Sequence, residues 1–176
     1  MSIEQVLEKV VACLQQERIQ FGIGGSLLLH HHGLPVTPLD IDLVVALADA
    51  ERTVLLLSEM GTVLEQDEMS LYATEVFKEF MIEGIDLDLM SGLQVHHDEG
   101  VFVYPFDEQS IDSTGLPFMA LVDWYVIYQL IPGRDQKVTM IEDVFTKQEV
   151  DHERLEQLRQ LVLPKAVRNR IDQWLN

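Results

Sequence analysis

The chain has 176 residues, of which 47% are hydrophobic, and a formal net charge of −18 at pH 7. This composition supports the core of one domain of ordinary size and argues against a disordered chain. The negative charge repels phosphate backbones and therefore argues against general nucleic-acid binding. No apolar run has the length of a membrane span, and no basic region precedes an apolar run at the N-terminus, so we expect a cytoplasmic protein without a membrane partner.

Helices and strands alternate in the first part of the sequence, as judged from the period of the apolar residues. The predicted elements are a helix over 3–17, a strand over 19–23, a helix over 27–32, a strand over 41–47, a helix over 49–60, strands over 62–66, 71–77 and 80–90, and a hairpin turn at 96–100. The strand over 41–47 has a continuous apolar run, which is typical of a strand inside a sheet.

Beyond Pro105 the pattern becomes helical. Helices are predicted over 118–130 and 138–145, then from Asp151 as N-cap, and finally up to about Trp174. The sequence therefore predicts an α/β (α+β) protein with a mixed β-sheet and flanking helices. Its core would occupy residues 1–110, and a C-terminal helical region over 111–176 would pack on that core.

Two short motifs could carry chemistry. Gly24-Gly25-Ser26 ends the first predicted strand, and such a glycine pair allows a sharp turn and a close approach of the backbone to a ligand. The free N–H groups of the following helix would face a bound anion. Asp40 and Asp42 are two residues apart on the next strand, so both carboxylates lie on one face. An anion site beside two carboxylates suits a nucleoside triphosphate bound with a divalent metal.

A further carboxylate on a neighbouring strand would complete such a site. The predicted strand over 80–90 offers two candidates, Asp86 and Asp88, which again share one face. The periodicity alone does not choose between them. Hard oxygen ligands of this kind favour Mg²⁺ or Mn²⁺.

The order of these motifs resembles the signature of the DNA polymerase beta-like nucleotidyltransferase superfamily: a Gly-Gly-Ser turn, a short helix and Asp-x-Asp. Within it the chain is most similar to small stand-alone members, of the antibiotic-modifying or minimal toxin type. The resemblance covers residues 19–92 and implies a nucleotidyltransferase fold. It also implies a metal-dependent enzyme that transfers a nucleoside monophosphate from an NTP to a hydroxyl of a small molecule or protein.

The resemblance also implies residue roles. The segment Leu87-Asp88-Leu89-Met90-Ser91-Gly92 fits a recurrent apolar-Asp-apolar-Met-x-Gly pattern, which selects Asp88 over Asp86. Asp40, Asp42 and Asp88 would then be catalytic metal ligands, and Asp88 would also act on the acceptor hydroxyl. Gly24, Gly25 and Ser26 would bind the nucleotide. Arg134 and Lys137 match a basic pair that binds phosphates in relatives; the alternative interpretation is a helix cap and surface charge.

Other interpretations remain open at this stage. The loop before Asp40 carries Thr37 but no arginine, which many relatives have there. A catalytically inactive nucleotide-binding or regulatory module of the same fold is therefore an alternative to the enzyme. A toxin-type modifier of tRNA ends is disfavoured by the negative charge, and a ligand-free interaction domain is the third alternative. The sequence does not determine the oligomeric state.

Overall fold

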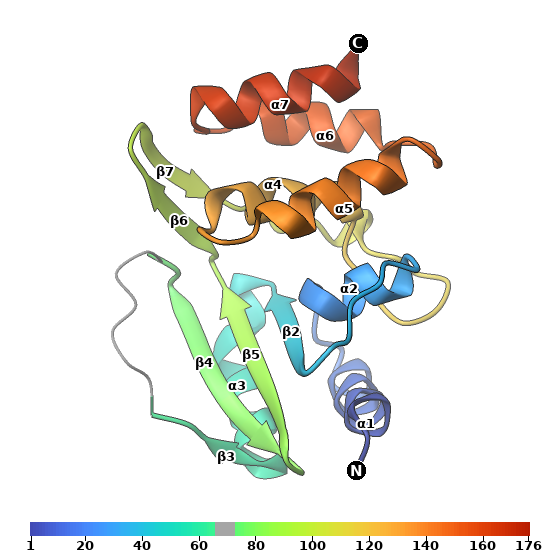
Figure 1. Cartoon of the computed structure of the whole chain (residues 1–176). Coiled ribbons are helices and arrows are strands. Elements are labelled where there is room, and N and C mark those ends of the chain that lie inside the picture. Colours follow the sequence, from blue (N-terminus) through green and yellow to red (C-terminus); the bar gives the residue numbers. More distant parts are fainter. Residues whose placement is uncertain (66–72) are drawn as a thin grey trace.

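A computed structural model describes residues 1–65 and 73–176 of the chain (Figure 1). The predicted alternation of helices and strands is confirmed, and the fold is a mixed sheet with flanking helices. The helices are α1 (Ile3–Gln16), α2 (Gly25–His31), α3 (Ala50–Met60), α4 (Leu121–Leu130), α5 (Asp135–Phe145), α6 (His152–Arg159) and α7 (Lys165–Leu175). Two 3₁₀ turns lie at Leu47–Asp49 and Glu108–Ser110.

The main sheet has the strand order β1-β2-β5-β4-β3. Its strands are β1 (Phe21–Ile23), β2 (Asp40–Val45), β3 (Thr62–Val63), β4 (Val76–Ile82) and β5 (Ile85–Ser91), and a separate hairpin is formed by β6 (Gln94–His97) and β7 (Gly100–Val103). Strands β2 and β5 are parallel, whereas the other neighbours in the sheet are antiparallel. Strand β2 is therefore an interior strand, as its continuous apolar run predicted.

The prediction of one strand over 80–90 is wrong. Strand β4 runs to Ile82, and the chain turns at Glu83 and Gly84 before β5 begins. Both turn residues have positive φ, 51° and 85°, which is the backbone of a tight two-residue hairpin whose twist matches the adjoining strands. The predicted strand over 71–77 is correct only at its C-terminal end, and its residues 71–72 and the acidic turn before it lie outside the described residues.

One face of the sheet is covered by α1 and α3, which also contact each other. Ile41 and Leu43 of β2 and Leu87 of β5 point to this face and are fully buried. Alternation along a strand sends the neighbouring side chains to the opposite face. The aspartates of β2 therefore point away from α1 and α3, and the hydrophobic pattern of the strand determines where they lie.

Helices α4 to α7 lie on the side of the molecule that carries the C-terminus (Figure 1). There α6 and α7 contact each other, and both contact α4. Helix α4 starts three residues later than predicted because Phe118 instead pairs with Ile23 beside the edge strand β1. Residues on every side of α4 are buried, so it is the central helix of this region. Asp151 caps α6 as predicted, since its carboxylate accepts a hydrogen bond from the Arg154 backbone N–H.

A buried ion pair joins α4 to α6. Asp123 is fully buried, and its carboxylate accepts hydrogen bonds from Arg154 Nε at 2.8 Å and from the Tyr104 hydroxyl at 2.6 Å. The Arg154 guanidinium also donates to the Pro105 carbonyl at 3.0 Å. The cluster therefore joins α4, α6 and the segment that follows β7. Within the described residues, none of the helices has the length and apolar character needed to cross a bilayer.

Candidate active site

The glycine pair lies between β1 and α2 and is packed against two different neighbours. Gly24 precedes the helix, and a Cβ atom there would lie 2.2 Å from the indole ring of Trp124. Gly25 has a φ of +58°, and a Cβ atom there would lie 1.7 Å from Asp42 Oδ2. Substitution at either position would therefore displace a neighbour, and at Gly25 that neighbour is a predicted metal ligand. The sequence predicted a close backbone approach, but to a ligand and not to a carboxylate.

The turn is tied to the strand that carries the carboxylates. The Gly24 N–H donates to the Asp42 carbonyl at 3.0 Å, so this N–H is used within the protein and does not face a ligand. The Ser26 hydroxyl donates to Asp40 Oδ1 at 3.3 Å. The predicted nucleotide-binding residues thus lie directly beside the Asp40 and Asp42 pair, and one of them orients a carboxylate.

The parallel register brings the predicted third carboxylate next to this pair. Asp42 is opposite Asp88, and Asp40 is opposite Asp86. Asp88 is half-buried and lines a cavity with Asp40 and Asp42, whereas Asp86 is exposed and does not line it. The structure therefore brings together the three aspartates that the sequence selected and leaves Asp86 at the solvent-facing end of the strand.

This cavity has a volume of about 200 Å³ and lies between the sheet and helices α4 and α5. One wall carries the carboxylates, and the other carries Arg134 and Lys137 at the start of α5. Arg134 and Lys137, to which the resemblance gave the phosphates, thus line the same cavity as the carboxylates, and their role stays a prediction. The apolar part of the lining is formed by Phe77, Met90, Leu93, Trp124, Ile127 and Ile131. Such a cavity can hold a ligand with an anionic part and a less polar part.

The carboxylates repel one another in a poorly solvated position. Burial, followed by the charges of Asp40 and Asp88, raises the pKa of Asp42 from 3.8 to about 7. Burial, followed by the charge of Glu79, raises the pKa of Asp88 from 3.8 to about 6. On the opposite wall, burial followed by the charge of Arg134 lowers the pKa of Lys137. Each wall thus holds like charges that a ligand of opposite charge would stabilise.

The donor set of the acidic wall suits a hard divalent cation. Carboxylate oxygens are the ligands that Mg²⁺ prefers, and their mutual repulsion is relieved when a cation binds. Among the residues that the structure describes, no three His, Cys, Asp or Glu side chains form a group that could hold a metal ion by themselves. Mg²⁺ is commonly held by one or two carboxylates together with water and substrate phosphates, so this arrangement fits a metal that arrives with a nucleotide.

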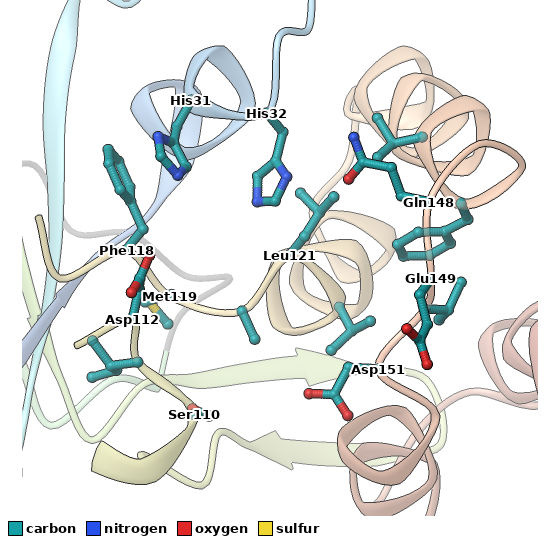
Figure 2. A pocket seen from close by; sticks show the side chains of 16 residues that line it. His31, His32, Ser110, Asp112, Phe118, Met119, Leu121, Gln148, Glu149 and Asp151 are labelled. Carbon is teal, nitrogen blue, oxygen red and sulfur yellow. The ribbon is translucent and has the colours of Figure 1, made fainter. Parts of the chain in front are cut away.

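A larger cavity, of about 340 Å³, lies beyond the C-terminal end of α2 (Figure 2). His31 and His32 face it from one side, and Glu149 and Asp151 from the other. His31 stacks on Phe118 at 4.1 Å, and Asp151 is already used as the cap of α6. None of the predicted catalytic or nucleotide-binding residues lines this cavity. We therefore assign the chemistry to the smaller cavity, where opposite charges converge.

Glu79 and Tyr128 also line the smaller cavity, and neither was predicted as part of the site. Glu79 of β4 lies opposite Asp88, but the wrong strand boundaries hid this pairing from the sequence. Tyr128 was interpreted as helix core, and it is buried as expected, but it also lines the cavity. No local pattern distinguishes such a tyrosine from an ordinary core residue, because its role depends on the packing of α4 against the sheet.

Comparison with solved structures identifies the fold. The chain is similar to TM1012 of Thermotoga maritima, provisionally assigned as a nucleotidyltransferase, with 21% identity, a TM-score of 0.60 and coverage of 82% of this chain and 93% of that one. It is also similar to the antibiotic-resistance factor ANT(2'')-Ia, with 14% identity, a TM-score of 0.58 and coverage of 98% and 94%. A third similar structure is that of the lincosamide antibiotic adenylyltransferase LnuA. It has 14% identity, a TM-score of 0.54 and coverage of 80% of this chain and 97% of that one.

The chain therefore has the nucleotidyltransferase fold, and the resemblance predicted from the sequence is confirmed at this level. Comparisons with protein-family models and with curated proteins found no match. Identities of this size show a common fold and do not by themselves transfer a substrate.

Proposed function

We propose that this protein is a nucleotidyltransferase that transfers a nucleoside monophosphate from an NTP to a hydroxyl group, with Mg²⁺ as the metal. The observation that carries the proposal is the cavity with Asp40, Asp42 and Asp88 on one wall and Arg134 and Lys137 on the other. Opposed walls of this kind match a metal-bound triphosphate, whose phosphates need cations and whose metal needs carboxylates.

The proposed reaction is an in-line displacement at the α-phosphorus. The acceptor oxygen forms a bond to this phosphorus, the bond to the bridging oxygen breaks, and pyrophosphate leaves with the electron pair. Asp88 accepts the proton of the attacking hydroxyl, a role that suits a carboxylate with a pKa of about 6 in the metal-free protein. Arg134 and Lys137 bind the leaving phosphates. Mg²⁺, held by Asp40 and Asp42, would neutralise charge on the phosphates.

A small molecule is the favoured acceptor. One neighbouring structure is ANT(2'')-Ia in complex with adenylyl-2''-tobramycin, and another is LnuA with lincomycin bound. Both of these proteins are thus seen with an antibiotic or an adenylylated antibiotic bound, and antibiotics are small molecules. The strong negative charge of the present chain also argues against a polyanionic acceptor. A hydroxyl group of a protein is the second candidate acceptor.

The test is transfer of label from each of the four NTPs, labelled at the α-phosphate, to a cell extract in the presence of Mg²⁺. Label in the small-molecule fraction together with pyrophosphate release is the expected result, and Asp42→Asn should abolish both. Gly25→Ala should abolish them as well, because its Cβ would collide with Asp42. The matched control is Gly33→Ala, since Gly33 also has a positive φ, +76°, but has open space around its Cβ position. Equal activity of Gly25→Ala and Gly33→Ala would contradict the assigned role of the turn.

The alternative is a nucleotide-binding module without turnover. The observation that favours it is the loop before Asp40, which carries Thr37 but no arginine. Under this alternative an NTP would bind and remain intact with Mg²⁺ present, and Asp42→Asn would change affinity but not NTP consumption. Pyrophosphate release by the wild-type protein therefore decides between the two functions.

A further inference from the structure

The hydroxyl of Tyr128 is a buried polar group without a hydrogen-bond partner in the described part of the chain. Only 3% of the Tyr128 side chain is exposed, and the residue lines the cavity that holds the carboxylates and cations. A buried hydroxyl that leaves water without finding a partner costs free energy, and native proteins rarely retain one without a reason. Because Tyr128 lines the cavity, a ligand bound there is a candidate for the missing partner.

The two other buried tyrosines in and near α4 both have hydrogen-bond partners. Tyr104 donates to Asp123 at 2.6 Å, and Tyr125, one turn before Tyr128 on the same helix, donates to Glu142 at 2.9 Å. The ring of Tyr128 is nevertheless held in place, because it packs against Trp124 at 5.1 Å between centroids and lies under Lys137 Nζ at 5.0 Å. The ring is thus held in place, and its hydroxyl has no acceptor among the described residues.

The surroundings of the hydroxyl indicate the chemistry of that acceptor. Burial, followed by the charge of Asp42, raises the pKa of Tyr128, so the phenol keeps its proton and can donate. Lys137 and Arg134 both lie at the start of α5 and line the cavity, and burial followed by the charge of Arg134 lowers the pKa of Lys137. An anionic oxygen would accept from the phenol and neutralise the cations at once. A cation or an apolar group would do neither.

We propose that the Tyr128 hydroxyl donates a hydrogen bond to a non-bridging phosphate oxygen of the bound nucleotide, beside the ammonium group of Lys137. This inference rests on the proposed function, because it takes the triphosphate as the ligand of the cavity. It adds a neutral donor to the two cations that the sequence identified. Tyr128 thereby adds a directional donor beside Lys137, whose ammonium group acts as a compact point charge.

The test is Tyr128→Phe, which removes the hydroxyl and keeps the ring. Calorimetric titration with Mg²⁺ and inorganic tripolyphosphate, and with each NTP, should show binding about tenfold weaker or worse, because a hydrogen bond to a charged acceptor is lost. The melting temperature of the free variant should equal or exceed that of the wild type, since no hydrogen bond is lost in the free protein. Tripolyphosphate makes the result independent of the base.

The matched control is Tyr125→Phe, the same substitution one helical turn away. It removes the hydrogen bond to Glu142, so the melting temperature should fall while tripolyphosphate affinity stays at the wild-type value. Wild-type affinity in Tyr128→Phe would overturn the inference and leave the proposed function intact. So would a change confined to the KM of the acceptor, because the hydroxyl would then contact the acceptor. Failure of the wild-type protein to bind tripolyphosphate or any NTP would overturn both proposals.

Discussion

Replacement of Asp42 by Asn should make the metal-free protein more stable at pH 8. Asp42 is held among other carboxylates, and burial and their charges raise its pKa from 3.8 to about 7. Asn has the same shape as Asp but no charge, so the variant removes the repulsion and keeps the packing. The wild-type site is therefore expected to reduce the stability of the fold, as functional sites commonly do.

The pKa values give the magnitude and the sign. A pKa of about 7 in place of 3.8 corresponds to at most about 4.5 kcal/mol at about 1.4 kcal/mol per pKa unit. Asp42 keeps partial solvent exposure, and screening reduces this value to about 2 kcal/mol. Because the pKa is raised on folding, the stabilising contribution is complete below about pH 4 and is lost as the pH rises through 7. The wild-type protein should therefore lose stability over this range, and Asp42→Asn should lose less.

Thermal unfolding in EDTA at pH values from 4 to 8 measures this difference. The melting temperature of Asp42→Asn should exceed that of the wild type by about 4–8 °C at pH 8, and the two curves should converge toward pH 4. Addition of Mg²⁺ at pH 8 should raise the wild-type value by mass action and the Asn variant much less. Asp98→Asn, on an exposed turn, is the control and should follow the wild type. Equal pH profiles of Asp42→Asn and wild type would refute the proposed repulsion.

Two further comparisons test other parts of the structure. Asp88→Ala should abolish nucleotidyl transfer while NTP binding is largely kept, whereas Asp86→Ala should lower the transfer rate only a little. Steady-state kinetics in which Asp86→Ala is the more impaired variant would exclude the assignment of Asp88 as the third carboxylate. Arg154→Met should destabilise the fold by about 3–5 kcal/mol in urea denaturation, because it leaves the fully buried carboxylate of Asp123 unpaired. Arg159→Met removes a partly exposed ion pair and should cost about 1 kcal/mol or less; similar losses for the two arginine variants would contradict the importance of the buried pair.

The architecture of the site suggests why the chain keeps an unfavourable arrangement of charges. Like charges face each other within each wall, and a buried hydroxyl lacks a partner among the described residues. Each of these features costs stability in the free protein, and a metal-bound triphosphate would relieve all of them together. The physical prediction is a protein whose melting temperature depends strongly on nucleotide and Mg²⁺.

Much of the carboxylate face could be predicted from the sequence, because it depends on local geometry. The spacing of Asp40 and Asp42 places both on one face of any strand, and the apolar residues between them determine which face is buried. The order of turn, short helix and Asp-x-Asp was sufficient to predict the fold class. Asp151 was predicted as a helix cap because a cap acts on backbone groups only three residues away.

The tertiary structure decided what depends on partners far away in the sequence. Asp86 and Asp88 share a strand face, and only the parallel register with β2 and the packing of α4 and α5 place Asp88 in the cavity and Asp86 outside it. Gly25 is required next to Asp42 because the turn and the strand meet in space. Tyr128 differs from an ordinary core residue only because its hydroxyl has no hydrogen-bond partner among the described residues. Local spacing determines the face on which a side chain lies, whereas strand register and helix packing determine what it meets there.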